Sequence, residues 1–146
     1  MICYLDTSAL VKLYVDENGS DAVRELVNKS LIVATCKVAY TEARAALARG
    51  FREGALEEKG YRLALSAFLH DWHSYLSVEV SDSLMNLAGD LTEKHPLRGF
   101  DAIHAAAVLT LNQRVREPIV VACWDVRLWD AVRAYDLETV PEARPS

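Results

Sequence analysis

Short apolar runs recur along the chain, each bounded by polar or turn-forming residues. Runs of this length that are rich in β-branched residues are typical of buried strands. The predicted strands cover residues 2–5, 31–34, 76–80 and 119–122, with a short last strand near 139–140. Asp6 directly follows the first run, and Pro118 precedes the fourth.

Between these runs, apolar residues recur three or four positions apart, which is the spacing of one helix face. The predicted helices cover residues 7–15, 21–28, 38–49, 56–72, a segment from 82 to His95-Pro96, 99–113 and 127–135. Ser20 and Ser81 stand where N-cap residues are expected. Gly50 and Gly54 are predicted to separate the third helix from the fourth, so that the two helices form a hairpin.

Strands that alternate with helices indicate βαβ units around a parallel sheet. We therefore predict one α/β domain over residues 1–146, with helices on both faces of a central, mostly parallel sheet of four to five strands. Residues 141–146 are expected to form a loose tail. The chain shows no internal repeat and no linker.

Composition and charge narrow the class of protein. Hydrophobic residues make up 51% of the 146, an ordinary globular value, and no apolar run approaches the roughly 20 residues that span a bilayer. The N-terminus lacks the features of a signal peptide, so a cytoplasmic location without membrane contact is expected. The three cysteines are widely spaced and suggest neither a disulfide framework nor a zinc ribbon. A net charge of −5 argues against a protein that coats nucleic acid, but not against an enzyme that acts on it.

Three acidic residues lie at the ends of predicted elements. Asp6 and Asp125 follow strands, and Asp101 lies in the first turn of an alanine-rich helix. In open parallel sheets, ligands bind just outside the carboxyl ends of the strands. Taken singly, each residue has a plainer explanation as a helix cap, a first-turn acid or a turn residue. Their shared position in the fold favours a common site.

Glu42 differs, because it lies within a helix and its surface neighbours are small apolar residues. A carboxylate in such a place needs a cation, and either a metal ion or Arg49 is a candidate. Hard oxygen ligands suit Mg²⁺ and Mn²⁺, which assist phosphodiester hydrolysis by acidifying water and by stabilising negative charge. Four such acids therefore predict a metal-dependent hydrolase of phosphodiesters.

The chain resembles the PIN-domain family, and within it the VapC-type toxins of toxin–antitoxin pairs. Four motifs carry the resemblance and appear in the family's order: YLDTSALVKLY at 4–14, YTEAR at 40–44, LRGFDAIHAAA at 97–107 and CWDVRL at 123–128. Cys123 departs from the pattern, because Ser or Thr is frequent there and a thiol is a weaker hydrogen-bonding group.

The resemblance implies a three-layer PIN-like fold, a Mg²⁺ or Mn²⁺ site, endoribonuclease activity on RNA, a homodimer, and inhibition by a small VapB-like antitoxin. The residues that match the motifs are then assigned by role. The predicted catalytic metal ligands are Asp6, Glu42, Asp101 and Asp125. The predicted substrate-binding or supporting residues are Thr7, Ser8 and Arg98, and Arg98 is equally compatible with a surface ion pair. His104 is expected to orient a neighbour.

The sequence also bears on three alternative functions. A haloacid-type phosphatase needs an acid at position 8, where Ser8 stands. An inactive interaction module usually lacks one of the acids, and here all four are present. A PIN nuclease that acts on DNA, or in RNA processing without an antitoxin, stays open. For the antitoxin, apolar helical surfaces are the candidate contacts. Their aromatic residues are Phe51, Tyr61, Phe68 and Trp72.

Overall fold

Five strands form one sheet in the computed structural model, which describes every residue from Met1 to Ser146. Every pair of neighbouring strands is parallel. In sheet order the strands are β3 (Leu76–Val78), β2 (Ile32–Cys36), β1 (Ile2–Leu5), β4 (Ile119–Ala122) and β5 (Glu138–Val140). The central strand, β1, therefore pairs with β2 on one side and with β4, from the far end of the chain, on the other.

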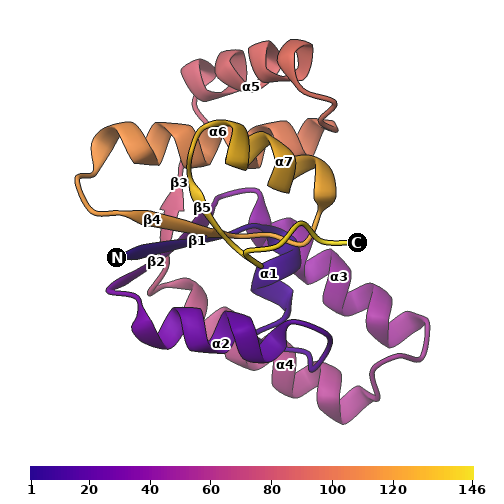
Figure 1. The fold of residues 1–146 in the computed structure, drawn as a ribbon. Helices are drawn as coiled ribbons and strands as arrows, with labels where there is room; N and C mark the ends of the chain where they lie inside the picture. Colours follow the sequence, from indigo (N-terminus) through magenta and orange to yellow (C-terminus); the bar gives the residue numbers. More distant parts are fainter.

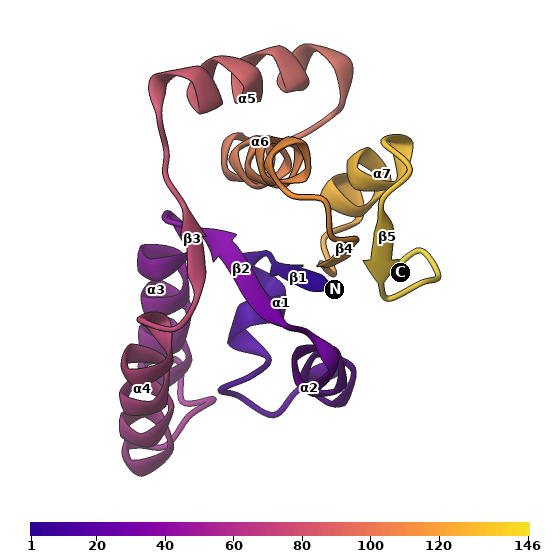
Figure 2. The same cartoon turned by 90° about the vertical axis from the view of Figure 1, so that its left-hand side faces the viewer.

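Seven helices cover the two faces of this sheet, which gives the predicted three layers (Figure 1). One face carries α1 (Thr7–Val11), α2 (Ser20–Lys29), α3 (Ala39–Arg52) and α4 (Glu58–Trp72); the other carries α5 (Asp82–Lys94), α6 (Gly99–Arg114) and α7 (Val126–Ala134). Figure 2 shows α3 and α4 as an antiparallel pair and α6 between α5 and the sheet.

Two hydrophobic cores lie on opposite sides of the sheet, because successive side chains of a strand point to opposite faces. Along β1, Ile2 and Tyr4 belong to the core under α5, α6 and α7. Cys3 and Leu5 belong to the core under α1–α4. All four side chains are almost wholly buried. This double burial explains why β1 is a continuous apolar run rather than an alternating one.

The sequence predicted the element order and the strand 119–122 correctly, and it placed several helix ends wrongly. The first helix ends at Val11 rather than at 15, and tighter turns follow, in which the Leu13 and Tyr14 amides donate to carbonyls three residues back. Gly50 does not break α3, which continues to Arg52. Gly50 instead makes room for the returning chain: the Leu56 side chain lies against it, and the Leu56 amide donates to its carbonyl at 3.0 Å.

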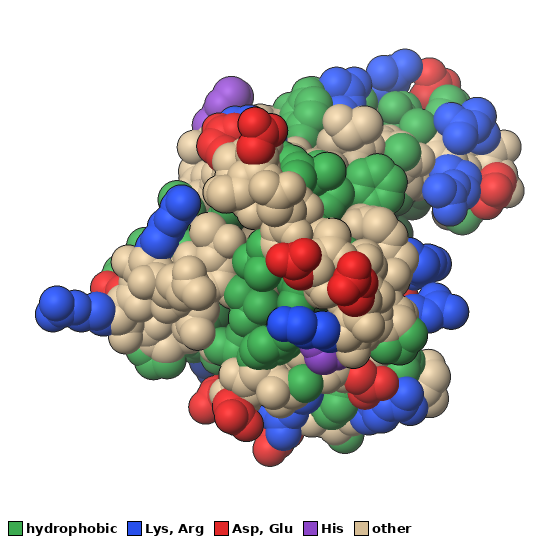
Figure 3. Space-filling view, turned by 90° about the horizontal axis from the view of Figure 1, so that it is seen from above, with side chains coloured by type: hydrophobic (Ala, Val, Ile, Leu, Met, Phe, Trp, Pro, Cys, Tyr) green, Lys and Arg blue, Asp and Glu red, His purple; other side chains and the backbone are tan.

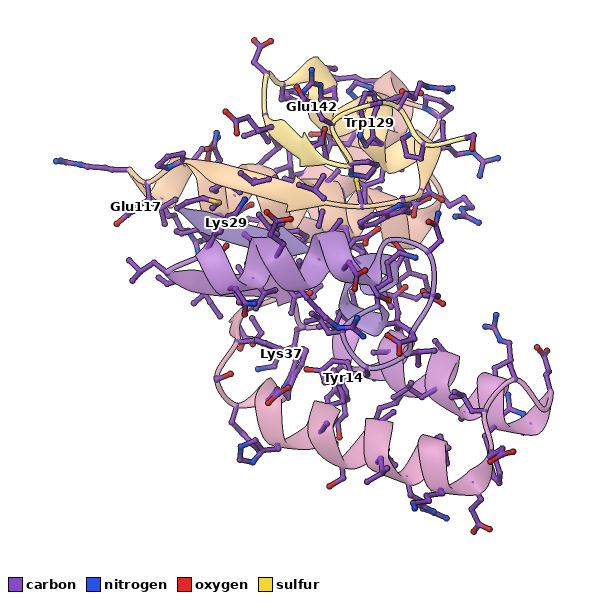
Figure 4. All side chains as sticks on the ribbon, turned by 60° about the horizontal axis from the view of Figure 1, so that its bottom comes forward. Tyr14, Lys29, Lys37, Glu117, Trp129 and Glu142 are labelled. Carbon is purple, nitrogen blue, oxygen red and sulfur yellow. The ribbon has the colours of Figure 1, made fainter.

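The chain ends beside α7. The Trp129 indole donates to the Pro141 carbonyl at 2.8 Å, and Figure 4 shows Trp129 next to Glu142. Arg144 forms a two-pronged ion pair with Asp130, at 2.9 and 3.0 Å. All three cysteines are free and buried. None of the helices is long and apolar enough to cross a membrane.

Phe68 is the centre of an aromatic cluster, so the hypothesis that it contacts a partner is wrong. Its side chain is wholly buried, with Tyr14, Tyr40 and Trp72 rings 5.5, 5.9 and 5.7 Å away between centroids. Packing between α4 and its neighbours is the physical reason. Phe51, by contrast, is 38% exposed and stacks on Tyr61 near the loop that connects α3 to α4.

We predict that Phe68→Ala lowers the free energy of unfolding by about 3–5 kcal/mol, because it leaves a cavity among rings that cannot close over it. Chemical denaturation monitored by circular dichroism measures the change. Leu63→Ala is the control on the same helix, since Leu63 is 63% exposed and its loss should change stability by less than about 0.5 kcal/mol. Equal effects of the two substitutions would contradict the assigned packing.

Candidate active site

The carboxyl ends of β1 and β4 lie side by side at the middle of the sheet, where Leu5 pairs with Ala122. Helix α1 begins at Thr7, after β1, and α7 begins at Val126, after β4 and a short loop (Figure 1). Asp6 and Asp125 are the N-cap residues of these helices, and Asp101 and Glu42 lie in the first turns of α6 and α3. Each predicted acid therefore occupies a helix N-terminus, where the positive end of the helix dipole favours a negative group.

Asp6 is the most deeply buried of the four acids, at 4% exposed. Its Oδ1 accepts hydrogen bonds from the Ala9 amide at 2.8 Å and from the Ser8 hydroxyl at 2.7 Å. Burial raises the pKa of Asp6, and the charge of Asp125 adds to the increase, although these hydrogen bonds oppose it. The other oxygen, Oδ2, receives no hydrogen bond from the protein. It is therefore available to coordinate a cation.

Thr7 and Ser8 join Asp6 to other parts of the site. The Thr7 hydroxyl donates to Glu42 Oε1 at 2.6 Å. Ser8, besides donating to Asp6, accepts from the Trp124 amide at 3.3 Å. Both hydroxyls thus hold the acids and the β4–α7 loop in place, which is the supporting part of the role predicted for them.

Glu42 is held by a buried histidine from another helix. His104 Nε2 lies 3.0 Å from Glu42 Oε1, and His104 Nδ1 lies 2.7 Å from the Tyr4 hydroxyl. Burial disfavours the charged form of Glu42, but the hydrogen bonds from His104 and Thr7 outweigh it, so the pKa of Glu42 lies below its usual value. Glu42 is therefore a carboxylate at neutral pH. Arg49, the alternative cation, forms no ion pair with it.

Arg98 bridges the remaining two acids. Its Nε donates to Asp101 at 3.1 Å and its Nη2 to Asp125 at 2.6 Å. Asp101 and Asp125 are mostly enclosed, whereas the Arg98 side chain is 65% exposed. An exposed guanidinium forms and loses such pairs at little cost. The ion pair that was one of the two expectations for Arg98 is therefore present, and it is made with site acids.

Cys123 is buried in the neighbourhood of the three aspartates. Burial raises the pKa of its thiol far above the usual value, and the charges of Asp6, Asp125 and Asp101 raise it further. The thiol consequently stays protonated and neutral among the acids. It makes no hydrogen bond, so the hydroxyl function expected of a Ser or Thr at this position is lacking here.

The acids suit a divalent cation by chemistry and by charge. All four offer carboxylate oxygens, the donors that Mg²⁺ and Mn²⁺ prefer. In this conformation no three of the His, Cys, Asp and Glu side chains converge closely enough to hold one ion. The cation that does lie among them is the Arg98 guanidinium, which pairs with two of the four carboxylates and balances one of the four negative charges.

Two hollows meet at the acids. One, of about 700 Å³, is lined by α5 and α6, and the other, of about 880 Å³, by α1, α3 and the residues that follow each of them. Both share Glu42, Arg98 and Phe100, and Phe100 is 57% exposed at their junction. On the face formed by α5–α7, acidic and basic side chains are interspersed with hydrophobic patches (Figure 3).

Sequence reasoning missed the partners of Glu42. It expected His104 to orient a neighbour, without identifying Glu42, and it did not single out Tyr4. One signal was available: a tyrosine in a strand that is buried on both faces needs a hydrogen-bond partner for its hydroxyl. Residues 4, 42 and 104 are too far apart in sequence for any local pattern to join them.

Comparisons with known proteins agree on one family. A profile of the PIN domain matches residues 3–115. Two proteins of Mycobacterium tuberculosis, Ribonuclease VapC45 and Ribonuclease VapC49, are each 35% identical to this chain over 140 residues. Each alignment covers 96% of this chain and 95% of the relative.

Solved structures share the fold at lower identity. VapC20 of Mycobacterium tuberculosis, described as a sarcin–ricin loop cleaving toxin, superposes with a TM-score of 0.66 at 17% identity and covers 98% of this chain and 99% of its own. VapBC2 of Rickettsia felis, bound to a promoter DNA fragment, gives 0.64 at 14% identity, with 95% and 97% covered. VapBC-1 of nontypeable Haemophilus influenzae gives 0.62 at 18%, with 95% and 96% covered.

The raised pKa of Asp6 predicts a stability effect of definite sign. Because the folded state binds this proton more tightly than the unfolded state, the metal-free protein loses stability as pH rises through the pKa of folded Asp6. Asp6→Asn removes the charge and keeps an oxygen that caps α1 about as well. Its urea midpoint at pH 7 should therefore exceed that of the wild type, and the difference should vanish near pH 3, below the unfolded pKa of about 3.9.

Asp130→Asn is the matched control. Its ion pair with Arg144 lowers the pKa of Asp130, so its carboxylate stabilises the fold above the unfolded pKa. Its replacement should not raise the midpoint at pH 7. A wild type that is as stable as Asp6→Asn at pH 7 without metal, or more stable, would contradict the predicted cost of the Asp6 charge.

Proposed function

The chain belongs to the PIN-domain family, and from this we propose that it is the ribonuclease toxin of a toxin–antitoxin pair, which hydrolyses RNA phosphodiester bonds. The placement of Asp6, Glu42, Asp101 and Asp125 at helix N-termini along one edge of the sheet, where Arg98 joins two of them, carries the proposal. Relatives named as ribonucleases, aligned over nearly the whole chain, support it. The four acids are the proposed catalytic residues.

We assign these carboxylates as ligands of Mg²⁺ or Mn²⁺, directly or through water. When bound, such an ion stabilises the negative charge that develops on the phosphodiester during hydrolysis. The chain's own contribution is to hold the ligands ready. Ser8 and the Ala9 amide fix one oxygen of Asp6, and Thr7 fixes one oxygen of Glu42. The remaining oxygens are left to a cation.

Arg98 is proposed to serve two partners in turn. In the metal-free state it pairs with both Asp101 and Asp125 and balances one of their two charges. With a divalent ion held by these carboxylates, the exposed guanidinium of Arg98 would be free to donate to a phosphate oxygen of the RNA. Arginine suits this second role because its planar donors match phosphate oxygens.

The partners follow from the same proposal. The substrate is RNA, and a small VapB-like antitoxin inhibits the enzyme, as the VapBC complexes with this fold suggest. We also propose a homodimer. Because RNA and newly made antitoxin are both found in the cytoplasm, we propose that the protein acts there.

We predict that RNA cleavage requires Mn²⁺ or Mg²⁺ and two of the assigned acids in particular. Asp6→Asn and Asp101→Asn should each lower cleavage of total RNA by at least about 100-fold, since even groups that only orient a metal ligand contribute 10–100-fold. EDTA should abolish wild-type cleavage. Addition of Mn²⁺ should raise the melting temperature of the wild type by binding the folded state, and that of the variants much less.

Asp90→Asn is the control, because Asp90 is an exposed acid on α5. It should cleave RNA and respond to Mn²⁺ like the wild type. If both site variants cleave at the wild-type rate, the assignment of the metal ligands is wrong. If the wild type binds Mn²⁺ and cleaves no RNA, the chain is an inactive interaction module or acts on another substrate, and cleavage of single-stranded DNA separates the two.

Expression of the wild type alone should arrest bacterial growth, because cleaved RNA stops protein synthesis. Joint expression with the small reading frame that adjoins its gene should restore growth. Colony counts after induction measure both effects, with Asp101→Asn as the inactive control. Growth arrest that persists with every adjoining reading frame would contradict the antitoxin and leave the nuclease assignment intact.

A further inference from the structure

The Tyr4 hydroxyl is a buried polar group that the proposed reaction does not use. Tyr4 lies in the middle of the central strand and is wholly buried. Its hydroxyl has one hydrogen-bond partner, His104 Nδ1, at 2.7 Å. The two rings meet edge to face, 5.9 Å between centroids. A hydroxyl placed in a hydrophobic core is costly unless its hydrogen bond is made, so this contact constrains His104.

The hydrogen-bond inventory decides where His104 carries its proton. A phenol has one O–H donor, and Nδ1 is the sole acceptor within reach of Tyr4. If Nδ1 carried a proton, Tyr4 would be a buried donor without an acceptor. The proton on Nε2 satisfies every group: Tyr4 donates to Nδ1, and Nε2–H donates to Glu42 Oε1 at 3.0 Å, with Thr7 Oγ1 at 3.2 Å as a secondary acceptor.

The Nε2–H form determines which oxygen of Glu42 is free. Oε1 accepts from both Thr7 and His104, whereas Oε2 accepts from no group in the protein. The Glu42 side chain is 25% exposed and lines both hollows of the site. With the proton on Nδ1 instead, the lone pair of Nε2 would face Oε1 and repel it. The carboxylate would then lose one of its two holding bonds.

We propose that Tyr4 is a positioning residue: its hydroxyl fixes His104 in the Nε2–H form, and His104 in turn holds Glu42 with Oε2 turned to the cation. Tyr4 touches neither substrate nor metal and acts only through the ring of His104. Groups beyond the ligands often set the tautomer of a histidine and the orientation of a ligand in this way. The inference rests on the proposed metal-dependent function.

The test compares two deletions of a single phenolic hydroxyl. Tyr4→Phe removes the hydroxyl on His104. Tyr14→Phe, the matched control, removes a part-buried hydroxyl that contacts Asp71 and Tyr75. Tyr14, labelled in Figure 4, packs in the core under α1–α4, and its hydroxyl bonds to none of the four acids. Two-bond ¹H–¹⁵N spectra of the metal-free protein report the tautomer of His104, assigned with His104→Gln, and calorimetry gives the dissociation constant for Mn²⁺.

We expect the wild type and Tyr14→Phe to show the Nε2–H form alone, with equal Mn²⁺ affinity. Tyr4→Phe should show a mixture of tautomers and a dissociation constant raised about tenfold, the lower end of the range for groups beyond the ligands. In the His104→Gln background, Tyr4→Phe should cause no further loss, because it acts through the ring.

Three results would overturn the inference. They are a wild-type spectrum with a proton on Nδ1, Mn²⁺ binding by Tyr4→Phe that equals Tyr14→Phe, and additive losses in the double variant. The spectrum of the wild type decides the matter even if Tyr4→Phe does not fold. A wild type that binds Mn²⁺ and cleaves RNA while Tyr4→Phe behaves like Tyr14→Phe refutes the inference alone. A wild type that does neither refutes the proposed function, and the inference with it.

Discussion

Like-charged carboxylates that lie close together in a partly dehydrated place repel one another, and this repulsion constrains the whole carboxyl edge of the sheet. Among the four acids, Asp6 is the most buried, and this loss of contact with water raises its pKa. The fold offsets the repulsion with fixed partial charges, since each acid lies at a helix N-terminus. The offset is incomplete in the case of Asp6, whose pKa remains raised. The packing of the two cores therefore holds Asp6 in a position where burial disfavours its charged form.

The charges in the two halves of the site are stabilised by different means. Glu42 is stabilised by buried, directional hydrogen bonds from Thr7 and His104, which do not depend on solvent. Asp101 and Asp125 share one positive charge, that of Arg98, an exposed side chain whose pairing is weakened by salt and by competing ions. A cation that enters the site thus meets one rigid acid and two whose present partner is easily displaced. Glu42 can therefore define the geometry of the site, while Asp101 and Asp125 adjust when a cation binds.

Local patterns predicted the elements and the acids, and they failed where a contact joins distant segments. Ser81 caps α5 as expected, because capping is a local interaction. Gly50 was misread as a helix end, since its role depends on Leu56 folding back over it. The positions of the acids could be predicted because element ends can be read from the sequence, and a parallel sheet brings such ends to one edge; their role as metal ligands stays a prediction. The bridge made by Arg98 and the contact between Tyr4 and His104 depend on tertiary structure alone.

The strand order has a consequence for the synthesis of this protein. The central strand β1 is made well before its partner β4, so a growing chain carries β1 with one side unpaired until residues 119–122 have left the ribosome. Asp125 lies just beyond β4, and neither the fourth acid nor the Trp124 contact with Ser8 exists before that point. The proposed RNA-cleaving site is therefore assembled only after β4 and the start of α7 have been made. Chains that stop before β4 lack the partner on one side of the central strand, and they also lack the fourth acid.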